Sequence, residues 1–365
     1  MLERHTHRDP HGSTAVCLSR CGITRVLAAA VVLACVVPGA IAQLAPERLY
    51  YGFGQRISID VTPPAGVADS LRIRLYDPAS GAVAAETSCA SGRVDLAGLF
   101  PRLWTTREPR VLYAQLMVGT EPHGPPLVLD PRLTPDTARL IDPGTLEPTD
   151  DLVRGVPMFE GTLREAAGDR STPVTFSALR VYPERDVVLH TDHGPMRFRL
   201  RPDVAPNTAY NFRHLAEGGF YTSVIFHRII NELDNGTRFV VQMGDPSGTG
   251  MGGPGYMLDL EPSDLPHGFG VLSMARAGDP NSAGSQVFIC LSRTGTSGLD
   301  ARYTSFAELI EGPDVLNSIA SVPTDENDRP VTPPVVERAE LVDAAPYPER
   351  AAPLREQPIM LDSGR

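Results

Sequence analysis

The residues of this sequence that could do chemistry gather between 226 and 303, and several familiar arrangements are missing there. The Gly-rich run 248–253 lacks the Lys-Ser/Thr ending of a phosphate-binding loop. Neither Ser285 nor Ser297 lies in a Gly-x-Ser-x-Gly nucleophile elbow. The histidines after residue 42 show no metal-ligand spacing, so we expect no metal and no cofactor. What remains is a series of short apolar stretches that hold Arg228, Gln242 and Gln286 close to Phe side chains.

Strands and two helices are expected to position these stretches. Apolar and polar residues alternate over 187–191 and 196–200 around a turn, which predicts a β-hairpin. Pro206 suits the first turn of a helix that ends at Gly218-Gly219, and a second helix is expected from Pro313. Strands joined by Gly-rich loops, together with two helices, predict a closed antiparallel β-barrel whose ends the helices cap.

Several of these stretches resemble the cyclophilin family of peptidyl-prolyl cis-trans isomerases, and they follow one another in that family's order. They are 226–230, 239–245, 270–275 and 284–289, then Leu299-Asp300 followed by Tyr303 and Phe306. With the helix segment 205–212, the resemblance covers about 186–343. It implies a mostly β fold, a closed cyclophilin-like barrel capped by two helices, and isomerisation of X–Pro bonds.

The resemblance also implies roles for individual residues. It makes Arg228 the catalytic cation, with Phe239 and Gln242 beside it. The implied substrate-binding positions are Val240, Ala275, Arg276, Ala277, Gln286, Phe288, Leu299 and Tyr303. An X–Pro bond isomerises slowly because the amide must lose its resonance, at a barrier of about 18–20 kcal/mol. An apolar pocket for the Pro ring and a fixed donor near the amide would favour the twisted state over both planar forms.

This sequence departs from the family pattern at four positions and in one loop. Val240 stands where the family usually has Met, and Arg276 stands in place of Asn. The family's pocket Trp falls near Gly298, and Tyr303 replaces a His. The loop 231–238 is longer than its family counterpart. We expect these changes to affect the affinity for cyclosporin more than the isomerase chemistry.

The residues before this region follow a different pattern. Over 47–135, apolar side chains alternate with polar ones in several short runs separated by Pro- and Gly-containing turns. This pattern predicts a small β-sandwich, immunoglobulin-like, with no motif for chemistry. A linker is expected over 136–185 and a disordered tail over 344–365.

Composition supports this organisation and excludes some classes of protein. The chain has 365 residues and 35 Pro, a Pro content about twice the usual one, which argues against a helical bundle. Its net charge of -11 argues against nucleic-acid binding, which needs a basic face.

The first 42 residues have the layout of a secretory signal. A charge-free apolar run over 26–37 is followed by Ala40-Ile41-Ala42, so cleavage is expected before Gln43. An alternative is a lipoprotein lipidated at Cys35. Either way the protein is expected to be exported, to the periplasm or the extracellular space, with membrane contact only through the signal or a lipid anchor. Two cysteines, Cys89 and Cys290, then remain, and we expect both as free buried thiols.

Three functions are open at this point. The first is a peptidyl-prolyl isomerase that helps exported proteins fold, acting on X–Pro bonds in unfolded or flexible segments. The second is a barrel that binds Pro peptides without turnover. The third places the main function in 47–135, as an adhesion or scaffold domain.

Overall fold

A computed structural model describes the chain in six stretches, all within one compact unit, Ala40–Arg365. They are 43–66, 70–106, 109–135, 137–141, 148–154 and 174–348. The expected signal peptide over 1–42 lies outside the described residues. Cys89 and Cys290 are free thiols, the first half-buried and the second buried. Within the described stretches, no helix is long and apolar enough to cross a membrane.

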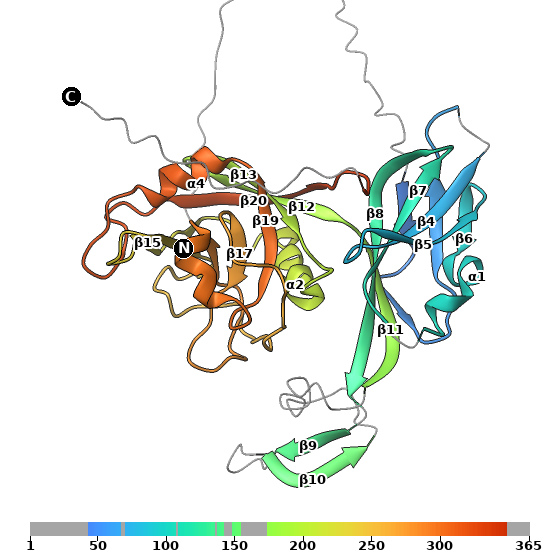
Figure 1. Ribbon diagram of the computed structural model, residues 1–365, viewed down its shortest axis with the longest axis horizontal. Coiled ribbons are helices and arrows are strands. Elements are labelled where there is room, and N and C mark those ends of the chain that lie inside the picture. Colours follow the sequence, from blue (N-terminus) through green and yellow to red (C-terminus); the bar gives the residue numbers. More distant parts are fainter. Residues whose placement is uncertain are drawn as a thin grey trace, which may run out of the picture. The chain divides into compact units, whose positions relative to one another are not determined.

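Two antiparallel sheets form the N-terminal half (Figure 1). The smaller has the order β1-β3-β6, with β1 at Gln43–Pro46, β3 at Ser58–Thr62 and β6 at Gly92–Asp95. The larger has the order β2-β11-β8-β7-β4-β5, with β2 at Tyr50–Gly52, β4 at Leu71–Asp77, β5 at Ala82–Ser88, β7 at Leu112–Val118, β8 at Glu121–Pro135 and β11 at Val174–Pro183. A short α1 (Leu96–Leu99) and the 3-10 turn η1 (Pro101–Leu103) follow β6. The remaining pair is β9 (Thr137–Ile141) with β10 (Pro148–Arg154).

The two sheets share one apolar core. Ile59 and Val61 of β3, and Ile73 and Leu75 of β4, are all buried in it. These are positions that the sequence alternation assigns to one face of each strand, so the predicted burial pattern is confirmed there. The immunoglobulin-like topology stays a prediction.

Two segments are more ordered than the sequence indicates. The expected linker 136–185 contains β11, which lies between β2 and β8 in the larger sheet. Within the expected tail 344–365, Tyr347 is buried: its ring packs against Tyr76 and Tyr113 at centroid distances of 4.7 and 5.3 Å. Both segments have low local periodicity and gain their order from partners distant in sequence. Residues 349–365 lie outside the described residues.

The C-terminal half is built on a nine-stranded antiparallel sheet in the order β14-β20-β12-β13-β19-β17-β18-β16-β15 (Figure 1). Its strands are β12 (Arg185–Thr191), β13 (Gly194–Leu200), β14 (Val224–Ile225), β15 (Arg228–Glu232), β16 (Arg238–Met243), β17 (Val271–Met274), β18 (Val287–Cys290), β19 (Ser305–Glu311) and β20 (Val335–Asp343). The two expected helices are present as α2 (Pro206–Glu217) and α4 (Pro313–Ala320), and each begins at its predicted Pro. Two short turns, α3 (Arg293–Thr296) and η2 (Ser297–Leu299), complete this half.

The sheet is strongly curled, but it does not close, so the prediction of a closed barrel is wrong. Its edge strands β14 and β15 are consecutive in the chain, with only Phe226 and His227 between them. The chain therefore passes directly from one edge strand of the sheet to the other, and these two strands form no hydrogen-bonded ladder with each other. Backbone groups at this gap are satisfied by a loop instead: Phe226 N–H donates to Pro334 O, and Ile229 N–H donates to Asp328 O.

A buried ion pair lies where the larger N-terminal sheet meets α2. Arg180 of β11 pairs with Asp130 of β8, and both side chains are almost fully buried. The Arg180 guanidinium also donates to Pro206 O at 2.9 Å, and it lies 3.9 Å from the ring centroid of Tyr210 on α2. One cation thus joins β8, β11 and the start of α2 through charge, hydrogen bonding and ring contact.

Candidate active site

Three neighbouring strands of the sheet, β17, β18 and β16, have different environments on their two faces. Val241, Leu272 and Ile289 point into the main core together with the helices. Their neighbours in sequence point to the opposite face and form a second, smaller apolar cluster, whose buried members are Val240, Leu265, Val271, Phe288 and Cys290. Period-two alternation therefore gives this sheet an inner face that stabilises the fold and an outer face available for binding.

A row of paired residues crosses the outer face. Arg228 of β15 is opposite Gln242 of β16, Gln242 is opposite Phe288 of β18, and Phe288 is opposite Ser273 of β17. Residues directly opposite each other on antiparallel strands point to the same face, and adjacent strands are about 4.8 Å apart. The ladder therefore places the cation, the amide and the aromatic ring side by side in that order.

The predicted pocket residues come together around Phe288. The side chains of Phe239, Ala275, Leu299 and Tyr303 are partly buried and pack against the cluster that contains Val240 and Phe288. The rings of Tyr303 and Phe288 meet edge to face at 5.7 Å. Residues from four separate parts of the sequence thus form one apolar patch, half-covered and open on one side.

Hydrogen bonds fix the polar residues of the site. Gln242 donates through Nε2 to Gln286 Oε1 at 2.9 Å, and Gln286 donates to the carbonyls of Gly250 and Gly252 at 2.9 and 2.8 Å. The Arg228 side chain is 47% exposed and donates to the carboxylate of Asp328. Asp328 has no local signal in the sequence, because it reaches the site from a loop 100 residues later.

A groove of about 700 Å³ adjoins this row. Gln242, Ala275, Ala277 and Gln286 line one side, and the Gly-rich segment 250–257 lines the other. The groove is wide enough for an extended peptide, and Ala275 to Ala277 border it along their length. The sequence places these residues in the binding site, and the structure places them together at one groove.

Arg276 also lines this groove. Its guanidinium lies over the ring of Tyr303, 4.5 Å from the centroid, and donates to the carbonyls of Ala277 and Arg302 at 3.0 and 3.3 Å. The positive charge therefore stands at the junction of groove and apolar cluster, held by a cation–π contact.

Comparison with known proteins agrees with this geometry. A family model described as cyclophilin type peptidyl-prolyl cis-trans isomerase matches residues 186–341. A peptidyl-prolyl cis-trans isomerase-like 1 of Neurospora crassa is 40% identical over 162 residues, which are 43% of this chain and 94% of the relative. This chain belongs to the cyclophilin-type peptidyl-prolyl cis-trans isomerase family. The predicted family and enzyme class are thereby confirmed.

Other similar proteins match the same cyclophilin region. A putative peptidyl-prolyl cis-trans isomerase of Staphylococcus epidermidis is 37% identical over 187 residues, covering 42% of this chain and 90% of the relative. A crystal structure of a Cryptosporidium parvum cyclophilin-type isomerase in the presence of the dipeptide Ala-Pro is 34% identical. It covers 42% of this chain and 96% of that one, with a TM-score of 0.39. The N-terminal sheets lie outside the family match.

One supporting residue of the cyclophilin site was missed by the sequence reasoning. His267 is buried behind Phe288, with the two rings stacked at 6.0 Å. Its Nδ1 lies 3.0 Å from Asp300 Oδ1, and its Nε2 lies 2.9 Å from Ser273 Oγ. Burial lowers the pKa of His267 below its ordinary value, so the ring is neutral at pH 7. The signal that could have found it is Asp300, which follows Leu299 in the family motif.

One wall of the cyclophilin pocket is absent at the position of the family's Trp. A Cβ atom added at Gly298 would meet no other atom within 4 Å, so the space beside Leu299 is open. Among the described residues, no group of three or more His, Cys, Asp or Glu side chains could hold a metal ion.

Proposed function

We propose that this chain accelerates the cis-trans isomerisation of X–Pro bonds in exported proteins and that Arg228 assists the reaction. The observation that carries the proposal is the row Arg228–Gln242–Phe288, which sets a charged donor beside an apolar patch on one face of the sheet. A Pro ring seated against Phe288 brings its preceding amide between the ring and the guanidinium.

The proposed catalysis is differential binding. Twisting the amide removes its resonance and localises a lone pair on the Pro nitrogen. A donor aimed at that nitrogen binds the twisted form better than either planar form, which lowers the barrier. Arg228 suits this role because its guanidinium stays charged and holds several donors in a rigid fork. Its Nε and Nη2 donate to Asp328, which leaves Nη1 as the donor directed to the substrate.

The proposed substrate is a flexible polypeptide segment that contains Pro. Its extended backbone lies in the groove beside Ala275 and Ala277, and its Pro enters the cluster around Phe288. Such a segment is accessible in unfolded or loop regions. The export of the enzyme rests on the signal pattern in 1–42, with lipidation at Cys35 as the alternative.

The activity is tested by following exchange of a short Ala-Pro peptide by NMR with the full chain and with Arg228→Ala and Arg228→Lys. We expect Arg228→Ala to lower kcat/KM at least 100-fold and Arg228→Lys to recover a small part, because Lys keeps the charge but loses the planar fork. Peptide binding should change much less than turnover. Equal rates for wild type and Arg228→Ala would contradict the proposed mechanism.

Export is tested separately. The full chain, produced in a bacterium with two membranes, should be recovered from the periplasm with Gln43 as its first residue, as determined by mass spectrometry. An intact Met1 in a cytoplasmic fraction would contradict the export proposal without affecting the isomerase proposal.

A further inference from the structure

An apolar pocket opens between the larger N-terminal sheet and the α1–η1 segment, far in sequence from the isomerase site. The larger sheet has six strands and the smaller has three, so at about 4.8 Å per strand they are roughly 24 and 10 Å wide. The smaller sheet cannot cover the whole inner face of the larger one. The short α1–η1 segment covers part of the remainder and leaves a cavity of about 550 Å³.

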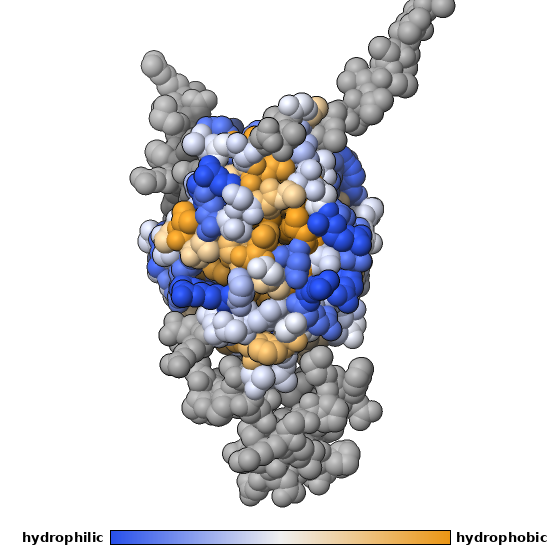
Figure 2. All heavy atoms as spheres, turned by 90° about the vertical axis from the view of Figure 1, so that its right-hand side faces the viewer, coloured by the Kyte–Doolittle hydropathy of each residue, from blue (hydrophilic) through white to orange (hydrophobic). Residues whose placement is uncertain are grey.

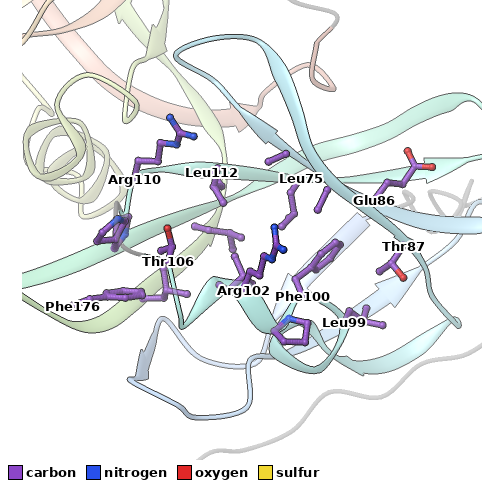
Figure 3. Close-up of a pocket in the computed structure, with 18 residues that line it drawn as sticks. Leu75, Glu86, Thr87, Leu99, Phe100, Arg102, Thr106, Arg110, Leu112 and Phe176 are labelled. Atoms are coloured by element: carbon purple, nitrogen blue, oxygen red, sulfur yellow. The ribbon is translucent and has the colours of Figure 1, made fainter.

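The lining of this cavity is mostly apolar. Leu75, Leu112 and Leu129 of the larger sheet form its floor, and Phe100 of the α1–η1 segment faces them (Figure 3). Arg102 and Arg110 line the same cavity, and Arg102 reaches in among the apolar side chains in this view. Its volume falls in the range of about 300–1,000 Å³ that is usual for ligand sites.

The strand at the border of the cavity has a free edge. β5 is the last strand of the larger sheet, and no strand among the described residues pairs with its outer side. Cys89 N–H donates to Leu71 O, so Leu71 and Cys89 form a hydrogen-bonded pair. Since such pairs alternate along an antiparallel ladder, Glu86 and Ser88 direct their backbone N–H and C=O groups outward.

Several side chains of β5 border the cavity. Ala85 and Thr87 are partly buried and line the cavity. Glu86 also borders the cavity, and its carboxylate pairs with Arg72 and Arg74 of β4. A strand added beside β5 would extend the six-stranded sheet and would place every second side chain over the cavity.

The surface around the cavity is apolar as well. Figure 2, which shows the side of the molecule that carries the N-terminal sheets, has a hydrophobic patch framed by hydrophilic residues. Phe53 is 59% exposed, and its ring contacts Trp104 and the cavity residue Phe176 at centroid distances of 5.7 and 5.9 Å. Exposed apolar surface of this kind marks interaction sites in folded proteins.

We propose that this pocket holds an extended segment of another polypeptide, which adds as a strand to the outer edge of β5 and inserts an apolar side chain into the cavity. The free backbone groups of β5 favour a polypeptide over a small apolar molecule, because a strand can pair with them and an apolar molecule cannot. The site is independent of the isomerase site, and its ligand needs no Pro.

Charge adds a preference to this site. Among the described residues, no carboxylate lies within ion-pair distance of Arg102, whereas Arg110 pairs with Asp77 at 3.1 Å. An acidic side chain beside the inserted apolar one would meet the Arg102 guanidinium at the mouth of the cavity. We therefore expect segments that combine Leu or Phe with Asp or Glu to bind best.

The chain contains a built-in reporter for this site. Trp104 is the single Trp of the sequence, and its ring lies 5.4 Å from that of Phe176, which lines the cavity. Its emission should respond to a ligand in the pocket, and the isomerase groove shares no lining residue with this pocket. The probe is the Pro-free peptide acetyl-Thr-Leu-Asp-Phe-Thr-Leu-Thr-amide, titrated into the full chain. We expect a saturable change in Trp104 emission, which Arg228→Ala leaves unaltered.

Two controls separate strand addition from simple apolar binding. Two forms of the same peptide are N-methylated at alternate residues, so that each form lacks the backbone N–H donors along one edge of the strand. The form whose blocked edge faces β5 cannot pair with it and should bind at least 10-fold more weakly. Ala85→Phe, which fills the cavity, should weaken binding at least 10-fold. Ser88→Pro, which removes an outward N–H, should weaken it about 5-fold, whereas Ser88→Thr should not change it.

Three results would overturn the proposal. The first is no saturable change in Trp104 emission with the probe. The second is equal binding of the probe and its N-methylated forms, which would show that the cavity takes apolar groups without strand addition. The third is a stable dimer, detected by sedimentation, that dissociates in the Ser88→Pro variant but does not dissociate when the probe is added. That result would make a second copy of the chain the occupant. The N-methylated peptides keep the test valid even if a protein variant fails to fold.

Discussion

Asp328 holds the guanidinium of Arg228 by two hydrogen bonds to one carboxylate oxygen, from Nε at 3.3 Å and from Nη2 at 3.1 Å. Asp328 has a φ of 62°, in the left-handed region, where Asp and Asn are among the few tolerated residues. This backbone conformation places the Asp328 carboxylate beside the Arg228 guanidinium. We infer that Asp328 positions Arg228 and leaves Nη1 for the substrate.

Asp328→Ala should lower kcat/KM for an Ala-Pro peptide about 2- to 5-fold. The expected effect is small because ion pairs exposed to this degree contribute about 0.2–1 kcal/mol. Asp328→Asn keeps an acceptor oxygen and tolerates the same φ, so it should stay within about 2-fold of wild type. Rates at low and high salt would distinguish the charge from the hydrogen bond. Full activity of Asp328→Ala at low salt would exclude a positioning role.

Gly298→Trp should be tolerated and should strengthen substrate binding. The side chain has room to enter, since a Cβ at Gly298 meets no atom within 4 Å. A ring placed over Leu299 would bury additional apolar surface around the Pro pocket, at about 25 cal/mol per Å². We expect KM to fall up to about 10-fold, with kcat nearly unchanged. Gly298→Ser is the matched control, and an unaltered KM in Gly298→Trp would show that this wall does not contact substrate.

Acid should destabilise the isomerase sheet through its two buried histidines. Burial lowers the pKa of both His227 and His267 below the ordinary value of about 6.5. The unfolded chain then binds protons that the folded chain does not, so the free energy of unfolding falls as pH drops below about 6.5. Each histidine contributes at most about 1.4 kcal/mol per pH unit in that window.

Hydrogen exchange of β17 and β18 at pH 7.5 and 5.5, corrected for intrinsic rates, measures this loss. His267→Gln, which can still donate and accept a hydrogen bond, should reduce the pH dependence by about half. The carboxyl of Asp300 does not interfere, because its hydrogen bonds with Arg293 and His267 hold its pKa below the usual range. A pH dependence unchanged by His267→Gln would assign the effect elsewhere.

Arg180→Met should destabilise the N-terminal half by about 3–5 kcal/mol. The substitution leaves the fully buried carboxylate of Asp130 without its close partner, and Arg132 is a longer one at 3.7 Å. Adding Asp130→Leu should restore most of the loss, since an apolar pair can replace a buried ion pair. Guanidinium unfolding followed by Trp104 emission measures both. Equal stability of Arg180→Met and wild type would show that the pair does not stabilise this half.

Local patterns predicted the faces of the strands and the starts of the helices. Period-two alternation placed Val187 and Leu189 of β12, and Met196 and Phe198 of β13, on the core face, and this holds without knowledge of the partner strands. Pro206 and Pro313 start α2 and α4 because Pro suits the first helical turn. The site residues from Arg228 to Tyr303 follow from a family motif, and the fold brings them to one face.

The remainder depended on contacts between distant segments. The sequence indicated a linker at β11 and a disordered tail at Tyr347, because neither has a local pattern that names its partner. The barrel was expected to close, whereas the two edge strands do not pair and loop carbonyls of Asp328 and Pro334 accept the hydrogen bonds there.

By itself, the sequence determined the family and the candidate site residues that its motifs name, since these reside in residue type and local spacing. Only the tertiary structure decided that Asp328 hydrogen-bonds to Arg228, that His267 packs behind Phe288 and that the larger N-terminal sheet and the α1–η1 segment leave an open cavity. These features arise from pairings across many residues, and the geometry of such pairings is fixed when the chain packs rather than by any local pattern.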